Sequence, residues 1–284
     1  MGVHKADANL RYFFVLIGPQ FFKKTKNRHF AGFVRQDFRI FGRTNIQSPM
    51  SESSFLFKQF IVRHDRCAMK VGTDGVLLGA WAPVAGTRTA LDVGTGTGLI
   101  ALQLAQRNPL LQVTAVEVDA DAASQASENV SASPWPDRIR VVCTDFRDFE
   151  PAARYDLIVS NPPYFIDALP CPDRQRNAAR HAGVLNYDLL FRRSAQLLDE
   201  GGVVSIVIPS EVERAAEDAA WMQGLYPCRR TRVYTKAGKP ARRVLVAYSR
   251  RLGPVDEDAL YIHQAGGDYS DDYRRLTGDF YLKF

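Results

Sequence analysis

Residues 90–98 read A-L-D-V-G-T-G-T-G, and this stretch decides the fold. Ala90–Val93 has strand character, glycine then occupies every second position, and Leu99–Gln106 repeats apolar residues at helical spacing. Glycine tolerates positive φ angles and lets a ligand lie against bare backbone. In open α/β sheets, ligands bind outside the carboxyl ends of the strands, where this turn would lie. The stretch therefore predicts a strand–turn–helix unit with a binding site at the turn.

Strand and helix patterns alternate along the rest of the chain. Six further strands are expected at Val113–Val118, Ile139–Cys143, Tyr155–Val159, Val203–Ile208, Arg230–Thr235 and Arg243–Tyr248. Helices are expected after the capping-type residues Thr73 and Asp74, at Ala120–Val130, at Tyr187–Leu198 with Gly201 and Gly202 as a stop, from Ser210 to about Met222, and at Ser270–Leu276. The alternation predicts an α/β fold with a mostly parallel seven-stranded sheet and helices on both faces. The final strand should be antiparallel, because the tight turn K-A-G-K-P at 236–240 precedes it.

Acidic residues follow the next two strands after the glycine-rich turn. Glu117 stands at the end of the second strand, where its carboxylate can accept hydrogen bonds from both hydroxyls of a ribose. Asp145 ends the third strand and could accept a proton from an adenine amino group, with Phe146 beside the ring. Together these residues suit an adenosine-containing ligand.

The spacing D-x-G-x-G-x-G differs from the G-x-G-x-x-G of nicotinamide-binding turns. It resembles the S-adenosylmethionine loop of class I methyltransferases, and an ordinary glycine-rich turn is the alternative. The resemblance implies a Rossmann-like fold and S-adenosylmethionine as the cofactor. The candidate cofactor-binding residues on this interpretation are Asp92, Gly94, Gly96, Gly98, Glu117, Asp145, Phe146 and Asn161.

The segment Ser160-Asn161-Pro162-Pro163-Tyr164 directly follows the fourth strand. Proline has no N–H, so the loop is rich in acceptors: the side-chain carbonyl of Asn161 and the backbone carbonyl of Pro162. Two acceptors suit an –NH₂ group, and Tyr164 offers a π-face for stacking. The motif N-P-P-Y resembles the catalytic signature of amino-nitrogen methyltransferases, which act on adenine N6, cytosine N4 or glutamine amides. We therefore expect Asn161, Pro162, Pro163 and Tyr164 to be catalytic, with a proline-rich surface turn as the alternative.

Four further segments narrow the substrate by resemblance. They are F-K-Q-F-I-V-R-H-D-R-C-A-M-K-V-G-T-D-G-V-L-L-G-A-W-A-P at 57–83, S-P-W-P-D-R-I at 133–139, R-V-L-V-A-Y-S at 243–249 and Y-S-D-D-Y-R-R-L-T-G-D-F-Y-L at 269–282. From about residue 54 onward the chain resembles the bacterial tRNA1(Val) (adenine(37)-N6)-methyltransferases. The resemblance implies that Lys70 and Thr73 lie against the methionine end of the cofactor. It also implies a tRNA anticodon stem-loop as the substrate and no obligate protein partner.

Other substrates and roles stay open on the residues alone. A methyltransferase acting on a ribosomal RNA base shares part of this architecture, and one acting on a protein glutamine amide also uses N-P-P-Y. The latter enzymes usually carry an extra helical domain, and about forty residues between Met50 and Asp92 are too few for one. A non-catalytic RNA-binding module is disfavoured by the intact Asp92, Gly94, Gly96, Asn161 and Tyr164.

The composition is that of an ordinary globular protein, with 46% hydrophobic and 24% charged residues. No apolar run approaches the ~20 residues that a membrane span needs. The four cysteines form no C-x-x-C pair, so we expect no metal site and reduced thiols in the cytoplasm.

Basic residues are concentrated in two parts of the chain. Residues 1–49 hold nine basic and two acidic residues and have no periodicity, so we expect a non-native leader, with Met50 as the initiator of a methyltransferase domain at 50–284. The stretch from Arg229 to Arg251 holds nine basic residues and no acid. It predicts an RNA phosphate-binding surface, or otherwise a charged edge strand. The candidate RNA-binding residues are Lys236, Lys239, Arg242 and, in the loop after N-P-P-Y, Arg174, Arg176 and Arg180.

Overall fold

The computed structural model describes residues 53–67, 69–163 and 185–284. Its strands are β1 (Ser54–Leu56), β2 (Ile61–Arg63), β3 (Thr89–Val93), β4 (Gln112–Glu117), β5 (Ile139–Cys143), β6 (Tyr155–Ser160), β7 (Leu198–Pro209), β8 (Tyr226–Tyr234), β9 (Ala241–Ser249) and β10 (Asp256–Tyr261). Its α-helices are α3 (Thr73–Trp81), α4 (Leu99–Arg107), α5 (Ala120–Ser131), α7 (Tyr187–Leu197), α8 (Glu213–Trp221) and α9 (Asp271–Thr277). The expected leader at 1–49, Tyr164, Arg174, Arg176 and Arg180 lie outside the described residues.

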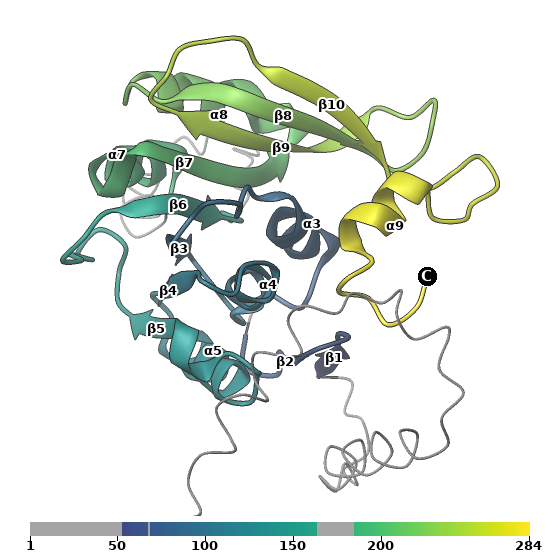
Figure 1. The fold of residues 1–284 in the computed structure, drawn as a ribbon. Coiled ribbons are helices and arrows are strands. Elements are labelled where there is room, and N and C mark those ends of the chain that lie inside the picture. Colours follow the sequence, from purple (N-terminus) through teal and green to yellow (C-terminus); the bar gives the residue numbers. More distant parts are fainter. Residues whose placement is uncertain (1–52, 68, 164–184) are drawn as a thin grey trace, which may run out of the picture. The chain divides into compact units, whose positions relative to one another are not determined.

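The main sheet has eight strands in the order β10-β8-β9-β7-β6-β3-β4-β5 (Figure 1). All of them run in one direction except β9, which pairs antiparallel with β7 on one side and β8 on the other. The expected α/β fold, mostly parallel with an antiparallel strand near the end, is confirmed. β1 and β2 form a separate two-stranded antiparallel sheet.

The sheet has one strand more than the expected seven, because β10 adds to its edge in parallel with β8. The sequence of β10, D-E-D-A-L-Y, lacks the alternation of a half-buried strand. Its acidic residues instead face arginines across the pair: Glu257 forms an ion pair with Arg230, and Asp258 lies 3.8 Å from Arg229. Cross-strand charge pairing, the buried side chain of Leu260 and the stacking of Tyr261 on Tyr234 together hold this strand.

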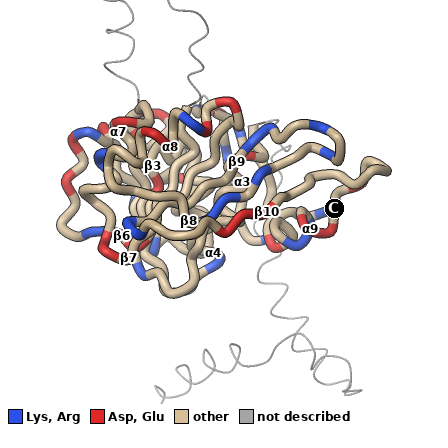
Figure 2. Tube along the Cα trace, turned by 90° about the horizontal axis from the view of Figure 1, so that it is seen from above, with Lys and Arg blue, Asp and Glu red and all other residues tan. Residues whose placement is uncertain are grey.

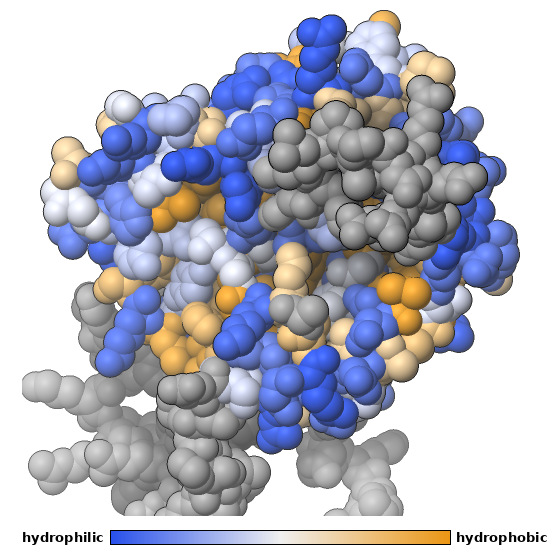
Figure 3. All heavy atoms as spheres, turned by 180° about the vertical axis from the view of Figure 1, so that it is seen from behind, coloured by the Kyte–Doolittle hydropathy of each residue, from blue (hydrophilic) through white to orange (hydrophobic). Residues whose placement is uncertain are grey.

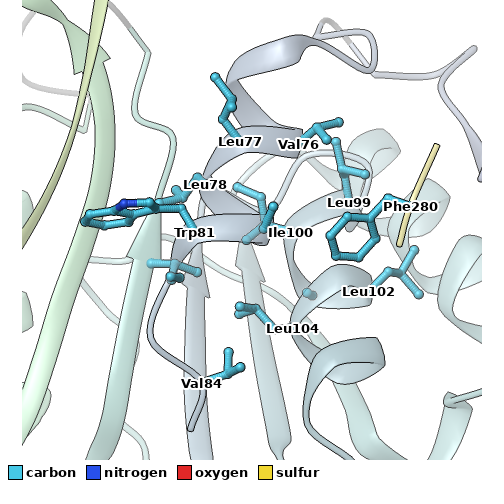
Figure 4. Close-up of a cluster of buried hydrophobic side chains, with 14 of the residues drawn as sticks. Val76, Leu77, Leu78, Trp81, Val84, Leu99, Ile100, Leu102, Leu104 and Phe280 are labelled. Carbon is cyan, nitrogen blue, oxygen red and sulfur yellow. The ribbon is translucent and has the colours of Figure 1, made fainter. Parts of the chain in front are cut away.

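Helices cover both faces of the sheet, and each face has its own buried cluster. On one face α3 packs over β7 and β9, α4 over β4 and β5, and α9 against β10, and the core includes Val76, Leu77, Leu102, Val233 and Leu245. Figure 4 shows Phe280 beside Leu99 and Leu102 of α4, in the buried cluster that also holds Val76 and Leu77 of α3. On the other face α7 and α8 cover a second cluster. This arrangement leaves the carboxyl ends of the parallel strands as one continuous edge.

Side-chain caps begin three of the helices. The side chains of Asp119, Asn186 and Ser270 each accept a hydrogen bond from the backbone N–H three residues later, at 2.8 to 3.1 Å. The expected cap at Thr73 or Asp74 is wrong: Gly72 is the N-cap of α3, and it makes no side-chain bond.

The glycine pair at 201 and 202 is not the helix stop that its sequence suggests. α7 ends at Leu197, and both glycines lie inside β7. A Cβ atom on Gly202 would come within 2.9 Å of the backbone oxygen of Tyr155, so this position needs glycine for the close approach of two strands.

Among the described residues, no helix is both long and apolar enough to span a bilayer. On the side shown in Figure 3, hydrophobic residues form small groups separated by hydrophilic ones. That side therefore presents no large apolar patch among the residues in colour.

Candidate active site

The glycine-rich turn connects β3 to α4 at the carboxyl edge of the sheet. Gly94, Gly96 and Gly98 have φ angles of 69°, 55° and 81°, which other residues rarely adopt. A Cβ atom on Gly94 would meet no other atom within 4 Å, so the space above it is open to a ligand. One on Gly98 would lie 3.5 Å from the side chain of Ala126. Gly94 and Gly96 therefore line the site, whereas Gly98 serves the packing of α4 against α5.

Asp92 lies completely buried beneath this turn. Its Oδ2 atom accepts hydrogen bonds from the Thr95 hydroxyl at 2.6 Å and from the backbone N–H of Ala101 at 3.1 Å. Its Oδ1 atom is buried and has no hydrogen-bond partner among the described residues. Burial raises the pKa of Asp92 to about 7. The side chain therefore holds the turn in shape from beneath.

Glu117 ends β4, beside the turn. Its Oε2 atom accepts a hydrogen bond from the N–H of Gly96 at 2.8 Å, and Oε1 accepts from Val118 and Asp119 at 3.0 Å. Oε1 already has two donors, whereas Oε2 has one and keeps a second lone pair for a further donor. The carboxylate is thus held in a fixed position next to the turn and can still accept hydrogen bonds.

Asp145 and Phe146 follow β5. Arg147 donates through Nε to both carboxylate oxygens of Asp145 at 3.0 Å, and these hydrogen bonds keep the pKa of Asp145 below its ordinary value. Phe146 is buried in the core cluster of the α7 face, and an edge of it reaches the site. Both residues stand where the sequence pattern expects them, although the pairing of Asp145 with Arg147 was not expected.

Asn161 follows β6 and faces the glycine turn across the edge of the sheet. The hydroxyl of Ser160 donates to the backbone oxygen of Val93 at 2.9 Å, which joins the ends of β6 and β3. Pro162 is buried, and Pro163 is exposed. The start of the N-P-P-Y loop is therefore anchored to the strand that carries the glycine turn.

Two cavities meet along this edge. The first, of about 410 Å³, is lined by Lys70, Thr73, Asp74, Gly94 and Thr95, among others. The second, of about 540 Å³, is lined by Glu117, Asp145, Phe146, Pro163 and others. They share Met69, Gly94, Gly96 and Asn161, so they form one cleft with Asn161 where the two halves join.

Most of the residues expected to bind the cofactor line this cleft, and the exceptions are Asp92 and Gly98. Asp92 lies beneath the turn and Gly98 behind it. Cys67, Met69, Leu185 and Leu189 also line the cleft, and the sequence patterns did not single them out. Their apolar or sulfur-containing side chains carry no distinctive spacing, so only their place in the fold reveals them.

The basic turn after β8 lies at this same edge of the sheet. Arg243 in β9 pairs with Pro209 at the carboxyl end of β7 and with Val233 near the end of β8. Lys236, Lys239 and Arg242 are exposed. Figure 2 shows blue segments along this turn, on the right of the view. The turn therefore projects from the edge that holds the cleft.

Comparison with known proteins identifies the class of enzyme that this fold and cleft define. The family model described as "Methyltransferase small domain" matches residues 71–219. The crystal structure of a predicted O-methyltransferase from Agrobacterium tumefaciens superposes with a TM-score of 0.56 at 18% identity, over 73% of this chain and 96% of that one. The chain is a methyltransferase with the Rossmann-like fold.

More similar relatives narrow the family. The tRNA1(Val) (adenine(37)-N6)-methyltransferase of Bacteroides fragilis strain YCH46 is 51% identical over 237 residues, which cover 82% of this chain and 100% of the relative. The protein of the same name from Tolumonas auensis is 46% identical over 235 residues, with 82% and 99% covered. The chain belongs to the tRNA1(Val) (adenine(37)-N6)-methyltransferase family.

S-adenosylmethionine is the cofactor of such a methyltransferase, and the residues of the cleft fit it. The open space above Gly94 admits a ligand against the backbone, and the fixed Glu117 carboxylate offers acceptors to ribose hydroxyls. Asp92 supports this site from beneath, because its Oδ2 atom holds the turn through Thr95 and Ala101. The two halves of the cleft suit the methionine and adenosine parts of the molecule.

Proposed function

We propose that this enzyme methylates the N6 amino group of adenine 37 in the anticodon loop of tRNA1(Val). The observation that carries the proposal is the position of Asn161, which lines both halves of the cleft at their junction. An amino group held there would lie between the two ends of the bound cofactor, where the methyl group is expected. The names of the relatives support the choice of tRNA and of adenine 37.

The chemistry needs positioning more than acid–base catalysis. S-adenosylmethionine, when bound, supplies a methyl group on a sulfonium centre. We propose that the side-chain carbonyl of Asn161 and the backbone carbonyl of Pro162 accept the two hydrogens of the adenine amino group. These two hydrogen bonds favour a pyramidal amino nitrogen whose lone pair points at the methyl group. Once methylated, the nitrogen is cationic and releases a proton to water.

The cofactor contacts follow the two halves of the cleft. We propose that Lys70, Thr73 and Gly94 hold the methionine end, which carries a carboxylate. Glu117 accepts hydrogen bonds from the ribose, and Asp145 and Phe146 border the adenine ring. Tyr164, which lies outside the described residues, is proposed to stack on the target base.

The RNA would approach from the carboxyl edge of the sheet. Lys236, Lys239 and Arg242 are proposed to contact phosphates there, as are Arg174, Arg176 and Arg180 from outside the described residues. Enzymes that act on a base remove it from the stack, and an anticodon-loop base is already accessible. A cytoplasmic location follows from a tRNA substrate.

The test is nucleoside mass spectrometry of tRNA and ribosomal RNA from a deletion strain, together with methyl transfer by the purified chain. Loss of N6-methyladenosine from one tRNA, restored by the wild-type gene and not by one with Asn161→Ala, supports the proposal. Loss from ribosomal RNA, or methylation of a protein glutamine by the purified chain, would favour the two other substrates instead.

A further inference from the structure

A third cavity adjoins the cleft on the side of the basic turn. It measures about 360 Å³ and is lined by Thr73, Asp74, Leu77, Val233, Thr235, Arg242, Arg243 and Ile262. Thr73 and Asp74 also line the first half of the cleft, so the cavity and the cleft are neighbours that share a wall. The volume is near the lower limit of small-ligand sites, which suits one small unit rather than a helix.

The walls of this cavity combine an apolar floor with a polar rim. Leu77 and Val233 belong to the buried core beneath it, and Ile262 packs against that core. The segment after β10 is tied to β8 by two backbone bonds, from Ile262 to Tyr234 at 2.9 Å and from His263 to Thr235 at 3.0 Å. The floor is therefore part of the folded core and does not need a ligand to form.

Three charged residues line the rim. Arg243 donates through Nε to Oδ2 of Asp74 at 2.7 Å, so the opposite charges of these two side chains largely cancel. Arg242 is exposed on the neighbouring position of β9. Two arginines and one aspartate give a formal charge of +1, which matches a single phosphodiester. Thr73 and Thr235 add hydroxyls that can bond to a ribose or a base edge.

The cavity also lies at a suitable separation from Asn161. Asn161 follows β6, and Arg243 lies on β9, two strands away in the sheet. Two strand spacings amount to about 10 Å. A lateral offset of this size is within the span of two adjacent nucleotides.

We propose that this cavity receives the nucleotide next to the target adenine, with its phosphate on Arg242 and its sugar or base over the apolar floor. The inference rests on the proposed RNA substrate and adds a second nucleotide site to it. Arg243 is not proposed to bind this phosphate. Its hydrogen bond to Asp74 holds in place a residue that lines both the cavity and the cofactor cleft.

The test combines a protein substitution with a substitution in the RNA. Full-length tRNA1(Val) is assembled with an uncharged methylphosphonate at one linkage at a time on either side of adenine 37. The ratio kcat/KM is measured with the wild type, with Arg242→Gln and with the control Arg251→Gln. Arg251 is exposed just beyond the other end of β9 and offers the same change of charge.

We expect one linkage beside adenine 37 at which methylphosphonate lowers kcat/KM about tenfold for the wild type and for Arg251→Gln, as expected on removal of a charged hydrogen bond. With Arg242→Gln the same methylphosphonate should lower kcat/KM less than about twofold, because the arginine proposed to bind that phosphate is already absent. Equal reductions in Arg242→Gln and wild type at every linkage would overturn the inference while leaving the proposed function standing. If the wild type fails to methylate unmodified tRNA1(Val), the proposed function and the inferred nucleotide site are both wrong.

Discussion

The carboxylate of Glu117 accepts a hydrogen bond at 2.8 Å from the backbone N–H of Gly96, which lies in the turn after the neighbouring strand. Its other oxygen atom accepts from two successive N–H groups at 3.0 Å. Both oxygen atoms therefore have fixed positions before a ribose arrives, and binding need not pay for ordering this side chain.

Replacing Glu117 with glutamine should weaken cofactor binding. An amide has one acceptor oxygen, so Glu117→Gln must present its NH₂ group to at least one backbone N–H that now bonds to the carboxylate. We expect the Kd for S-adenosylmethionine to rise about tenfold or more, measured by isothermal titration calorimetry. Glu200→Gln, at an exposed position in β7, is the control and should bind like the wild type. An unchanged Kd for Glu117→Gln would contradict the assigned contact.

Removing the side chain of Asn161 should affect turnover far more than cofactor binding. Asn161→Ala removes the side-chain acceptor proposed for the adenine amino group. We expect kcat to fall about a hundredfold or more, the size of effect seen when one preorganised hydrogen-bonding group is removed from an active site. The Kd for S-adenosylmethionine should change little, because the glycine turn and Glu117 remain. Single-turnover kinetics measure the methyl-transfer step, and a rate within about threefold of the wild type would refute the role.

The buried carboxyl group of Asp92 should make stability depend on pH. Its folded-state pKa of about 7 lies above the ordinary value of 3.8. Its protonation therefore stabilises the fold fully below pH about 4, and this contribution disappears as the pH rises through about 7. Asp92→Asn has no group to titrate there.

The free energy of unfolding of the wild type, relative to Asp92→Asn, should accordingly decrease by up to about 4 kcal/mol between pH about 4 and 7. Urea unfolding at a series of pH values measures the difference. Parallel stability profiles for the two proteins would show that the carboxyl group titrates normally.

Neutralising the basic turn should weaken RNA binding without affecting the cofactor. With Lys236, Lys239 and Arg242 changed to alanine, we expect a higher KM for tRNA. The salt dependence of binding should flatten by about one unit of slope for each phosphate that the variant no longer binds. Filter binding over a range of salt concentrations measures the slope.

The matched control replaces three exposed arginines at the opposite edge of the sheet, Arg88, Arg154 and Arg251, with alanine. This variant has the same net charge, so any long-range effect of charge should appear in both. If the two triple variants have the same affinity for tRNA and the same salt slope, the turn is only a charged edge.

The sequence predicted the elements around the glycine turn well because several local signals agree there. Ile139–Cys143 forms β5 as expected, and Leu99 begins α4 directly after the turn. Glu117 and Asp145 could be placed on the same edge, because the carboxyl ends of parallel strands lie together. Each of these inferences needed only strand direction and periodicity.

Features that depend on interactions between distant segments were not predicted. β10 is held by ion pairs to β8, and its own sequence has no strand pattern. The bond between Arg243 and Asp74 joins residues 169 positions apart, so neither sequence neighbourhood reveals it. The third cavity is lined by both of these residues, and the sequence did not predict it.

The place of Phe280 in the buried cluster that α3 and α4 share bears on how the protein is made. α3 carries Thr73 and Asp74 at its first turn and lies in the first third of the chain, yet its packing is completed by a residue close to the last. A ribosome adds roughly 5–20 residues per second, so the helix must wait many seconds for this partner during synthesis. A chain released early would lack Phe280 and leave a hole beside the cofactor cleft. Premature termination should therefore yield unstable products open to proteolysis rather than a partly active methyltransferase.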